Sequence, residues 1–323
     1  MSRPPIVLVV LAVGAVLVLV LGAAACGTLD KPPGGGDSNP TSTSDSTASS
    51  GTTTSMPDSS STTLPAGAIS HASGTADVLI RFSTGGGFVP LEYNYTMVPS
   101  FTLYGDGRII VPGPETMQYP GAALPNLQTT VVSENVIQAM LAAAKEAGLF
   151  QNGVDYGQPG VTDVGTTTIT VNADGATYTS HIYALGFEDG GKLTMQQQQA
   201  RAAINDLRSK LNDPSTLTAE QLVWESYDFT ALRVFSRTVD TTASTDSTDI
   251  QPNHLPWPLA DLATSGEEVA NGQGLRKVVV SGDDLETLKA LLKQATDITL
   301  WGSGKAQYNL WLRPLLPDEA AGL

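Results

Sequence analysis

The residue types that most often carry chemistry are scarce in this chain. It has three His residues, His71, His181 and His254, and one Cys, Cys26. A zinc site needs four converging ligands, or three with a water molecule. The three His residues lie far apart, and no two have the spacing that would place them on one helix face. We therefore expect no metal site and no cofactor.

Candidate nucleophiles are equally weak. Ser303 lies between Gly302 and Gly304 but lacks the glycines two residues away that form a Gly-x-Ser-x-Gly nucleophile elbow. His181 and Asp163 could form a triad with a serine, although any Ser-rich chain offers that combination. We expect no catalytic residue, and a cell-envelope hydrolase with a site near His181 and Asp163 is the alternative.

Cys26 stands apart because of what precedes it. Arg3 supplies positive charge, residues 6–25 carry no charged side chain, and Ala23 begins a run of three alanines directly before Cys26. Small residues before a cleavage point are typical of a secretory signal peptide. The segment resembles the leader of a bacterial lipoprotein, and the resemblance implies that Cys26 is acylated and becomes the mature N-terminus.

The leader departs from that family in two ways. Ala23 stands where the family usually has Leu, and the apolar run is longer than in a typical signal peptide. Residues 6–25 are long enough to cross about 30 Å of hydrocarbon, so an uncleaved transmembrane anchor is the alternative. In both cases Arg3 favours the cytoplasmic side, which places the rest of the chain on the extracellular face of the cell membrane.

Composition limits the partners. The net charge is −15, and only 15% of residues are charged while 41% are apolar. An acidic protein repels phosphate backbones and anionic headgroups, so we expect no nucleic-acid binding and no electrostatic docking on lipid. The membrane partner must therefore be held by a lipid or by the apolar segment.

Residues 26–72 form a Ser-, Thr-, Gly- and Pro-rich segment. This segment has too few apolar residues for their burial to offset the entropy cost of ordering the chain. We therefore expect a disordered tether between the membrane and the folded part. The folded part resembles the ectodomains of uncharacterised lipoproteins of high-GC Gram-positive bacteria, a likeness that implies no particular activity.

The first folded module is expected over residues 73–213. Asp106-Gly107 between two β-prone segments predicts a hairpin, and Asp174-Gly175 predicts a second one. Ser133 is expected to cap a helix that buries its apolar face and ends at Gly148. A longer helix is expected from Leu193 to Leu211.

The second module, residues 214–323, has a similar order of elements. Val279-Val280-Ser281 matches Val131-Val132-Ser133, each before an amphipathic helix and a hairpin, and residues 281–284 have the form of a capping box. We therefore predict an α+β fold with tandem modules of antiparallel sheet and packed helices. This fold would follow a signal or anchor helix and a disordered linker.

Trp257 is the one candidate for partner binding. It lies between Pro256 and Pro258, which could stiffen a loop and present the indole to a protein or glycan. The alternative is that Trp257 folds back onto the core. Together these observations predict a surface lipoprotein whose folded part is a non-catalytic binding domain for a protein, glycan or small ligand.

Overall fold

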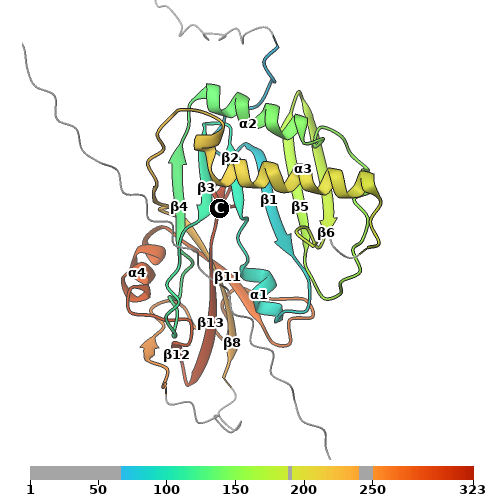
Figure 1. Ribbon diagram of the computed structural model, residues 1–323. Helices are drawn as coiled ribbons and strands as arrows, with labels where there is room; N and C mark the ends of the chain where they lie inside the picture. The colour runs from blue at the N-terminus through green and yellow to red at the C-terminus, as the bar shows by residue number, and fades with distance from the viewer. Residues whose placement is uncertain (1–66, 188–190, 240–249) are drawn as a thin grey trace, which may run out of the picture. The chain divides into compact units, whose positions relative to one another are not determined.

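The computed structural model describes residues 67–187, 191–239 and 250–323, which belong to one unit, Thr62–Leu323. Within them the chain is α+β, as predicted, with two sheets that are antiparallel apart from one parallel strand pair (Figure 1). The predicted leader, Cys26 and most of the tether lie outside the described residues. No helix of the described part is both long and apolar enough to cross a membrane.

The first sheet of the described residues has seven strands, in the spatial order β6-β5-β1-β2-β3-β4-β7. In that order they are β6 (Ala176–Tyr183), β5 (Thr166–Ala173), β1 (Val78–Gly85), β2 (Phe101–Tyr104), β3 (Arg108–Pro112), β4 (Leu127–Val131) and β7 (Glu225–Ser226).

The second sheet has six strands in the described part, in the order β10-β11-β8-β13-β12-β9. They are β10 (Glu267–Glu268), β11 (Arg276–Ser281), β8 (Ala231–Thr238), β13 (Ala306–Pro314), β12 (Leu300–Ser303) and β9 (His254–Pro256). Strand β9 pairs in parallel with β12 and was not predicted, because Pro256 within it and Pro258 just after it indicate a loop.

Five α-helices and one 3-10 turn complete the described chain. They are α1 (Leu91–Thr96), α2 (Glu134–Glu146), α3 (Met195–Asn212), η1 (Pro214–Thr216), α4 (Gly282–Leu292) and α5 (Pro317–Ala320). Figure 1 shows α2 and α3 covering one face of the first sheet, while α4 lies against the second sheet.

Helix α2 forms as the apolar spacing predicts. It buries Val136, Ile137, Met140, Leu141 and Ala144 against the first sheet. Its last turn closes at Gly148, whose φ is +80°, with the Leu149 N–H donating to the Ala144 carbonyl at 3.0 Å.

The caps differ from the prediction. Ser133 does occupy the N-cap position of α2, but its side chain makes no cap bond, and its hydroxyl donates to the charged carboxylate of Glu220 at 2.6 Å. Ser281 makes no side-chain cap bond either, so the predicted capping box at α4 is wrong. At α3, Thr194 and Gln197 do form a capping box.

Both predicted hairpins of the first sheet are present, as β2–β3 and β5–β6. At the β2–β3 turn Gly107 has φ +82°, and its N–H donates to the Tyr104 carbonyl at 3.0 Å. Alternation along β5 buries Thr167, Ile169 and Val171 on the helix-covered face and leaves the intervening residues facing outward.

The start of the folded part lies earlier than predicted. Ile69, placed in the tether, is buried in the core of the first sheet, and its N–H and carbonyl both bond to the side chain of Gln138. His71 contacts Glu134 at 3.0 Å. Residues 67–72 therefore pack with the first module, because Ile69 gives this stretch an apolar residue to bury.

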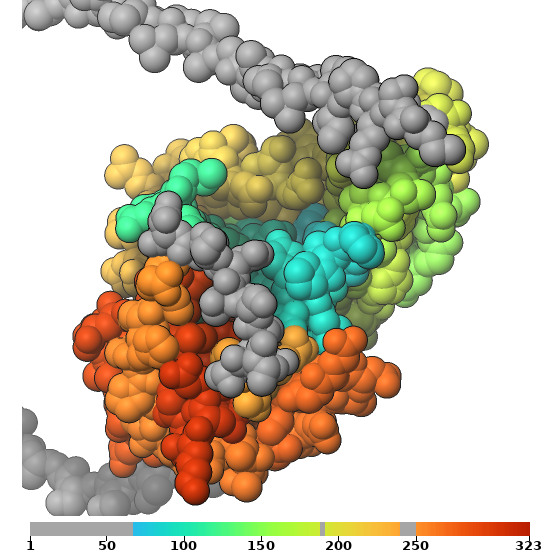
Figure 2. All heavy atoms as spheres, turned by 90° about the horizontal axis from the view of Figure 1, so that it is seen from below, coloured from blue at the N-terminus to red at the C-terminus, as the bar shows by residue number. Residues whose placement is uncertain are grey.

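The two sheets are not independent across the predicted boundary at residues 213 and 214. Strand β7 follows that boundary but pairs with β4 of the first sheet. Tyr95 of α1 stacks on Phe235 of β8, with ring centroids 5.3 Å apart. Figure 2 shows this side from below, where the cyan segment lies against orange residues of the second half of the chain.

The order strand, helix, hairpin occurs twice, as β4-α2-β5-β6 and as β11-α4-β12-β13. The hairpins join their sheets differently. In the first sheet the leading strand β5 lies inside and β6 forms the edge, whereas in the second sheet β13 lies inside, between β8 and β12. The local pattern recurs, but the sheet positions do not.

Candidate functional site

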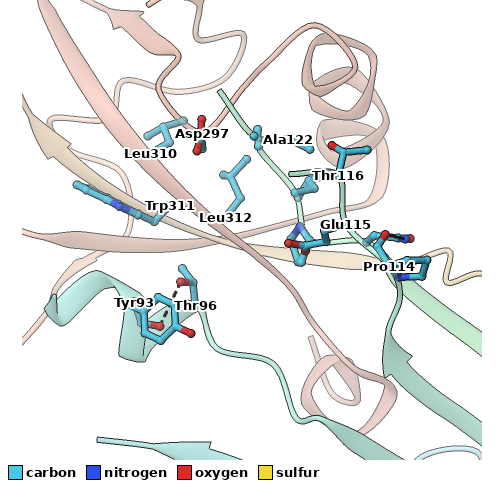
Figure 3. Close-up of a pocket in the computed structure, with 15 residues that line it drawn as sticks. Tyr93, Thr96, Pro114, Glu115, Thr116, Ala122, Asp297, Leu310, Trp311 and Leu312 are labelled. Carbon is cyan, nitrogen blue, oxygen red and sulfur yellow. Dashed lines mark hydrogen bonds between the residues drawn. The ribbon is translucent and has the colours of Figure 1, made fainter. Parts of the chain in front are cut away.

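The candidate site is a cleft of about 540 Å³ beside β13. It is lined by α1, by residues 114–116 and 121–126 of the loop between β3 and β4, by Asp297, and by β13 from Leu310 to Leu312 (Figure 3). We call it the β13 cleft. Its volume lies within the range of small-ligand sites in proteins.

The loop that forms one wall is held at both ends. Its ends meet where the Gly113 N–H donates to the Asn126 carbonyl at 2.7 Å, and the Asn126 amide donates to the Pro114 carbonyl at 2.7 Å. Further along, the Asp297 N–H donates to the Gly121 carbonyl at 3.1 Å. The loop is therefore closed at its base beside the first sheet and bonded further along to the segment that precedes β12.

Trp311 and Tyr93 form an aromatic wall. Figure 3 shows Trp311 projecting from β13 away from Leu310 and Leu312, as alternation along a strand requires. Tyr93 is 54% exposed, so a bound ligand could cover it. Aromatic rings of this kind bind sugars, apolar side chains and the stems of cationic side chains.

Arg237 fixes the Trp311 side chain from β8. Its guanidinium carbon lies 5.6 Å from the centre of the Trp311 ring. The same guanidinium forms an ion pair with Glu92 of α1, which is only 8% exposed, and donates to the Gly272 carbonyl at 3.0 Å. These contacts hold α1, β8 and the indole together, so the aromatic wall is set before any ligand arrives.

The cleft is acidic. Among its lining residues the charged side chains are Glu115 and Asp297, and none is Lys, Arg or His. Thr96, Thr116 and Tyr93 add hydroxyl groups, and the Thr96 hydroxyl donates to the Glu92 carbonyl at 3.0 Å. The arrangement suits a ligand with a positive charge or with hydroxyl groups and disfavours an anion.

A second polar cluster lies where the C-terminal segment meets the first sheet. Arg313 donates to both carboxylate oxygens of Glu319 at 2.9 and 2.7 Å, and Arg81 and Tyr104 bind Asp318. Burial raises the pKa of Tyr104 far above its usual value, and the hydrogen bond to Asp318 raises it further. This cluster joins two parts of the chain through groups that are already paired.

Burial also raises the pKa of Tyr227, to about 12. Its hydroxyl donates to the Leu315 carbonyl at 3.0 Å, next to the same cluster. Both tyrosines therefore stay neutral at physiological pH and act as hydrogen-bond donors rather than as bases.

The structure does not join His181 to Asp163. The His181 ring contacts the Thr168 hydroxyl at 3.1 Å on the outer face of the first sheet. The Asp163 carboxylate accepts a hydrogen bond from the neighbouring Thr162 at 3.2 Å, and Asp163 itself lies in a turn with φ +63°. Within the described residues no hydrogen bond or ion pair links the two, so a triad built on them has no support.

The other two His residues are also apart. His71 contacts Glu134 near the start of the folded part, and His254 contacts Gln307 at 3.1 Å on the second sheet. No group of three or more His, Cys, Asp or Glu residues in the described chain could hold a metal ion.

Trp257 lies in the core rather than at the surface, which is the second of the two interpretations of its sequence context. It is 8% exposed, packs edge-on against Trp301 with ring centroids 6.0 Å apart, and its indole N–H donates to the Ala260 carbonyl at 2.9 Å. The prolines direct the chain into β9 and bring the indole inward, so an exposed anchor at Trp257 is not present.

Trp311 is the tryptophan that lines the cleft. The sequence gathers all four Trp residues in the second half and indicates that alternation in the last hairpin buries at least one. That one is Trp301, which is 1% exposed. Nothing local in the sequence distinguishes Trp311, since its neighbours in the cleft come from α1 and from the loop near residue 120.

Comparison with known protein families, with curated proteins and with solved structures finds no match for this chain.

Proposed function

We propose that this chain is a surface lipoprotein, held on the outer face of the cell membrane by a lipid on Cys26, whose folded part is a non-catalytic binding domain. The ligand would bind in the β13 cleft. The observation that carries the proposal is that an aromatic wall, the carboxylates of Glu115 and Asp297 and several hydroxyl groups surround one open cleft.

The finer organisation belongs to the same proposal. Two α+β modules would be carried on a disordered tether behind a signal peptide or an anchor helix. The repeated order of strand, helix and hairpin supports a tandem origin, and the apolar segment at residues 6–25 supports the leader. The hydrolase alternative has no comparable support, because His181 and Asp163 make separate contacts with Thr168 and Thr162.

Two experiments test the two parts of the proposal. Mass spectrometry of the mature N-terminus should find a diacylated Cys26, and an intact Met1 would overturn the lipid anchor while leaving the binding domain untouched.

The binding domain is tested by pulling down envelope components with the full-length chain and with Trp311→Ala. Phe187→Ala is the matched control, because Phe187 is 49% exposed and lies outside the cleft. We expect Trp311→Ala to lose at least one captured component that Phe187→Ala retains. Identical captures by all three proteins would refute the assignment of the ligand to this cleft.

A further inference from the structure

Strand β13 presents part of its backbone to the cleft. In an antiparallel sheet, the N–H and C=O of one residue point to the same side, and successive residues point to opposite sides. The Val239 N–H donates to the Gln307 carbonyl at 2.8 Å, and the Leu315 N–H donates to the Ala231 carbonyl at 2.9 Å. Odd-numbered residues of β13 therefore bond to β8, and Leu310 and Leu312 direct their backbone groups to the other side.

On that other side the partner strand stops early. Strand β12 pairs with β13 only as far as Leu300 opposite Asn309. Before that point the chain turns away, with the Thr299 N–H donating to the Thr296 carbonyl at 3.1 Å. Within the described residues, the N–H and C=O of Leu312 thus have no partner strand, and they face the cleft.

The side chains on either side of this edge form two different walls. Leu310 and Leu312 project to one face of β13, next to Ala122 of the loop, while Trp311 projects to the other face with Tyr93 (Figure 3). An extended peptide also places successive side chains on opposite sides. A strand added here would therefore direct one side chain to the apolar wall and the next to the aromatic wall.

The charge of the cleft selects the peptide. Its charged lining residues are Glu115 and Asp297, and the nearby Arg237 is already engaged by Glu92. A Lys or Arg side chain could lay its stem on Trp311 and reach a carboxylate with its head, whereas an acidic side chain would meet only like charge.

We propose that the ligand of the β13 cleft is an extended peptide segment that adds to the open edge of β13 and carries a basic side chain between apolar ones. This inference rests on the proposed binding function and names the class of its partner. Main-chain hydrogen bonds at Leu312 would supply register, and the two walls and two carboxylates would supply selectivity.

The probe is a pair of synthetic peptides, acetyl-Val-Lys-Val-Lys-Val-amide and its Glu counterpart, titrated into the full-length protein and followed by tryptophan fluorescence. We expect the Lys peptide to bind at least about tenfold more tightly at low salt, with the ratio falling as salt rises. Equal affinities for the two peptides would overturn the proposed charge selection.

Backbone pairing is tested by N-methylating the Lys peptide one residue at a time. A peptide that pairs with Leu312 donates one N–H to the Leu312 carbonyl, so methylation should weaken binding about threefold to tenfold at one position and little at the others. Equal losses at every position, or no loss at any, would overturn strand addition.

The role of the cleft carboxylates in charge selection is tested with the double variant Glu115→Gln/Asp297→Asn. The matched control is the double variant Glu225→Gln/Glu268→Gln, which neutralises two exposed carboxylates outside the cleft. The first variant should lose most of the preference for Lys over Glu, and the control should keep it. Equal preference in both variants would contradict the assigned charges.

Binding of a glycan, chitotetraose, distinguishes a failure of the peptide inference from a failure of the proposed binding function. If chitotetraose binds, Trp311→Ala abolishes that binding and neither peptide binds, the peptide class is wrong and the binding function stands. If neither peptides, chitotetraose nor any envelope component binds the full-length chain, the proposed function itself fails together with this inference.

Discussion

The guanidinium of Arg81 in β1 donates two hydrogen bonds to the carboxylate of Asp318 in α5, at 2.9 and 2.6 Å, across 237 positions of the sequence. The Tyr104 hydroxyl donates to the same carboxylate at 2.7 Å. These bonds fasten the C-terminal segment, which follows the last strand of the second sheet, onto the first sheet. Figure 1 accordingly places the C-terminus beside the first sheet.

This contact predicts a pH-dependent part of the stability. Burial alone would raise the pKa of Asp318, but the hydrogen bonds from Arg81 and Tyr104 outweigh it and hold that pKa below its ordinary value of 3.8. A lowered folded-state pKa stabilises the fold above pH 3.8, and this contribution is lost as the pH falls through the folded-state value. Asp318→Asn should cost about 1–3 kcal/mol at pH 7 by urea unfolding, and less below pH 4.

The matched control for this prediction is Asp206→Asn. Asp206 is 64% exposed and pairs with Lys210 on the surface of α3. Surface pairs of this kind contribute about 0–1 kcal/mol, so the control should change stability little and show no comparable pH dependence. Equal losses in the two variants at pH 7 would show that the Arg81–Asp318 contact has no special role.

Trp257 and Trp311 lie in different environments, so truncating each to Ala should change the stability of the fold by different amounts. Trp257→Ala should lower the free energy of unfolding by about 3–5 kcal/mol, because it leaves a cavity against Trp301. Trp311→Ala should cost much less stability, since Trp311 is only partly buried, and should act mainly on ligand binding. Thermal unfolding with circular dichroism measures both, and a larger loss at Trp311 would contradict this division.

The glycines of two hairpin turns offer a matched pair. Gly107 has φ +82°, and a Cβ there would lie 2.3 Å from the Val132 carbonyl oxygen, so Gly107→Ala must displace backbone. Gly175 has φ +71° but no atom within 4 Å of such a Cβ. Gly175→Ala should cost about 1 kcal/mol for the left-handed conformation alone, and Gly107→Ala clearly more. Similar unfolding midpoints for the two variants would contradict the clash.

The first module should require the buried guanidinium of Arg201 in α3 for its stability. Arg201 is fully buried, and it donates to the Tyr156 carbonyl and to the carbonyls of Tyr183 and Ala184 at the end of β6. Arg201→Met keeps most of the volume but leaves these carbonyls without their donor, so we expect a loss of about 3–5 kcal/mol in urea unfolding. A loss below about 1 kcal/mol would mean that the carbonyls find other partners.

Much of the local structure could be predicted from the sequence. Helix α2 buries the five residues that its spacing indicates, and the Asp-Gly turns at Gly107 and Gly175 form the expected hairpins. These signals are readable because they depend on neighbours within a few residues. The helix caps at Ser133 and Ser281 were less predictable, because Glu220, far along the chain, takes the Ser133 hydroxyl.

The candidate site shows the opposite case. The sequence singles out Trp257 because its flanking prolines are local, yet β9 directs that indole into the core beside Trp301. It does not single out Trp311, whose place in the cleft depends on α1 and on a loop nearly two hundred residues earlier.

What the sequence by itself determined is the α+β class, the positions of most helices and hairpins and the acidic character, since these depend on composition and short-range periodicity. The lipid-bearing leader at Cys26 stays a prediction from the same kind of local signal. Only the tertiary structure decided which side chains share a space. Arg81 bonds to Asp318, and Tyr93 and Trp311 line the same cleft, because sheet register and chain crossings bring distant residues together, and no local pattern encodes those encounters.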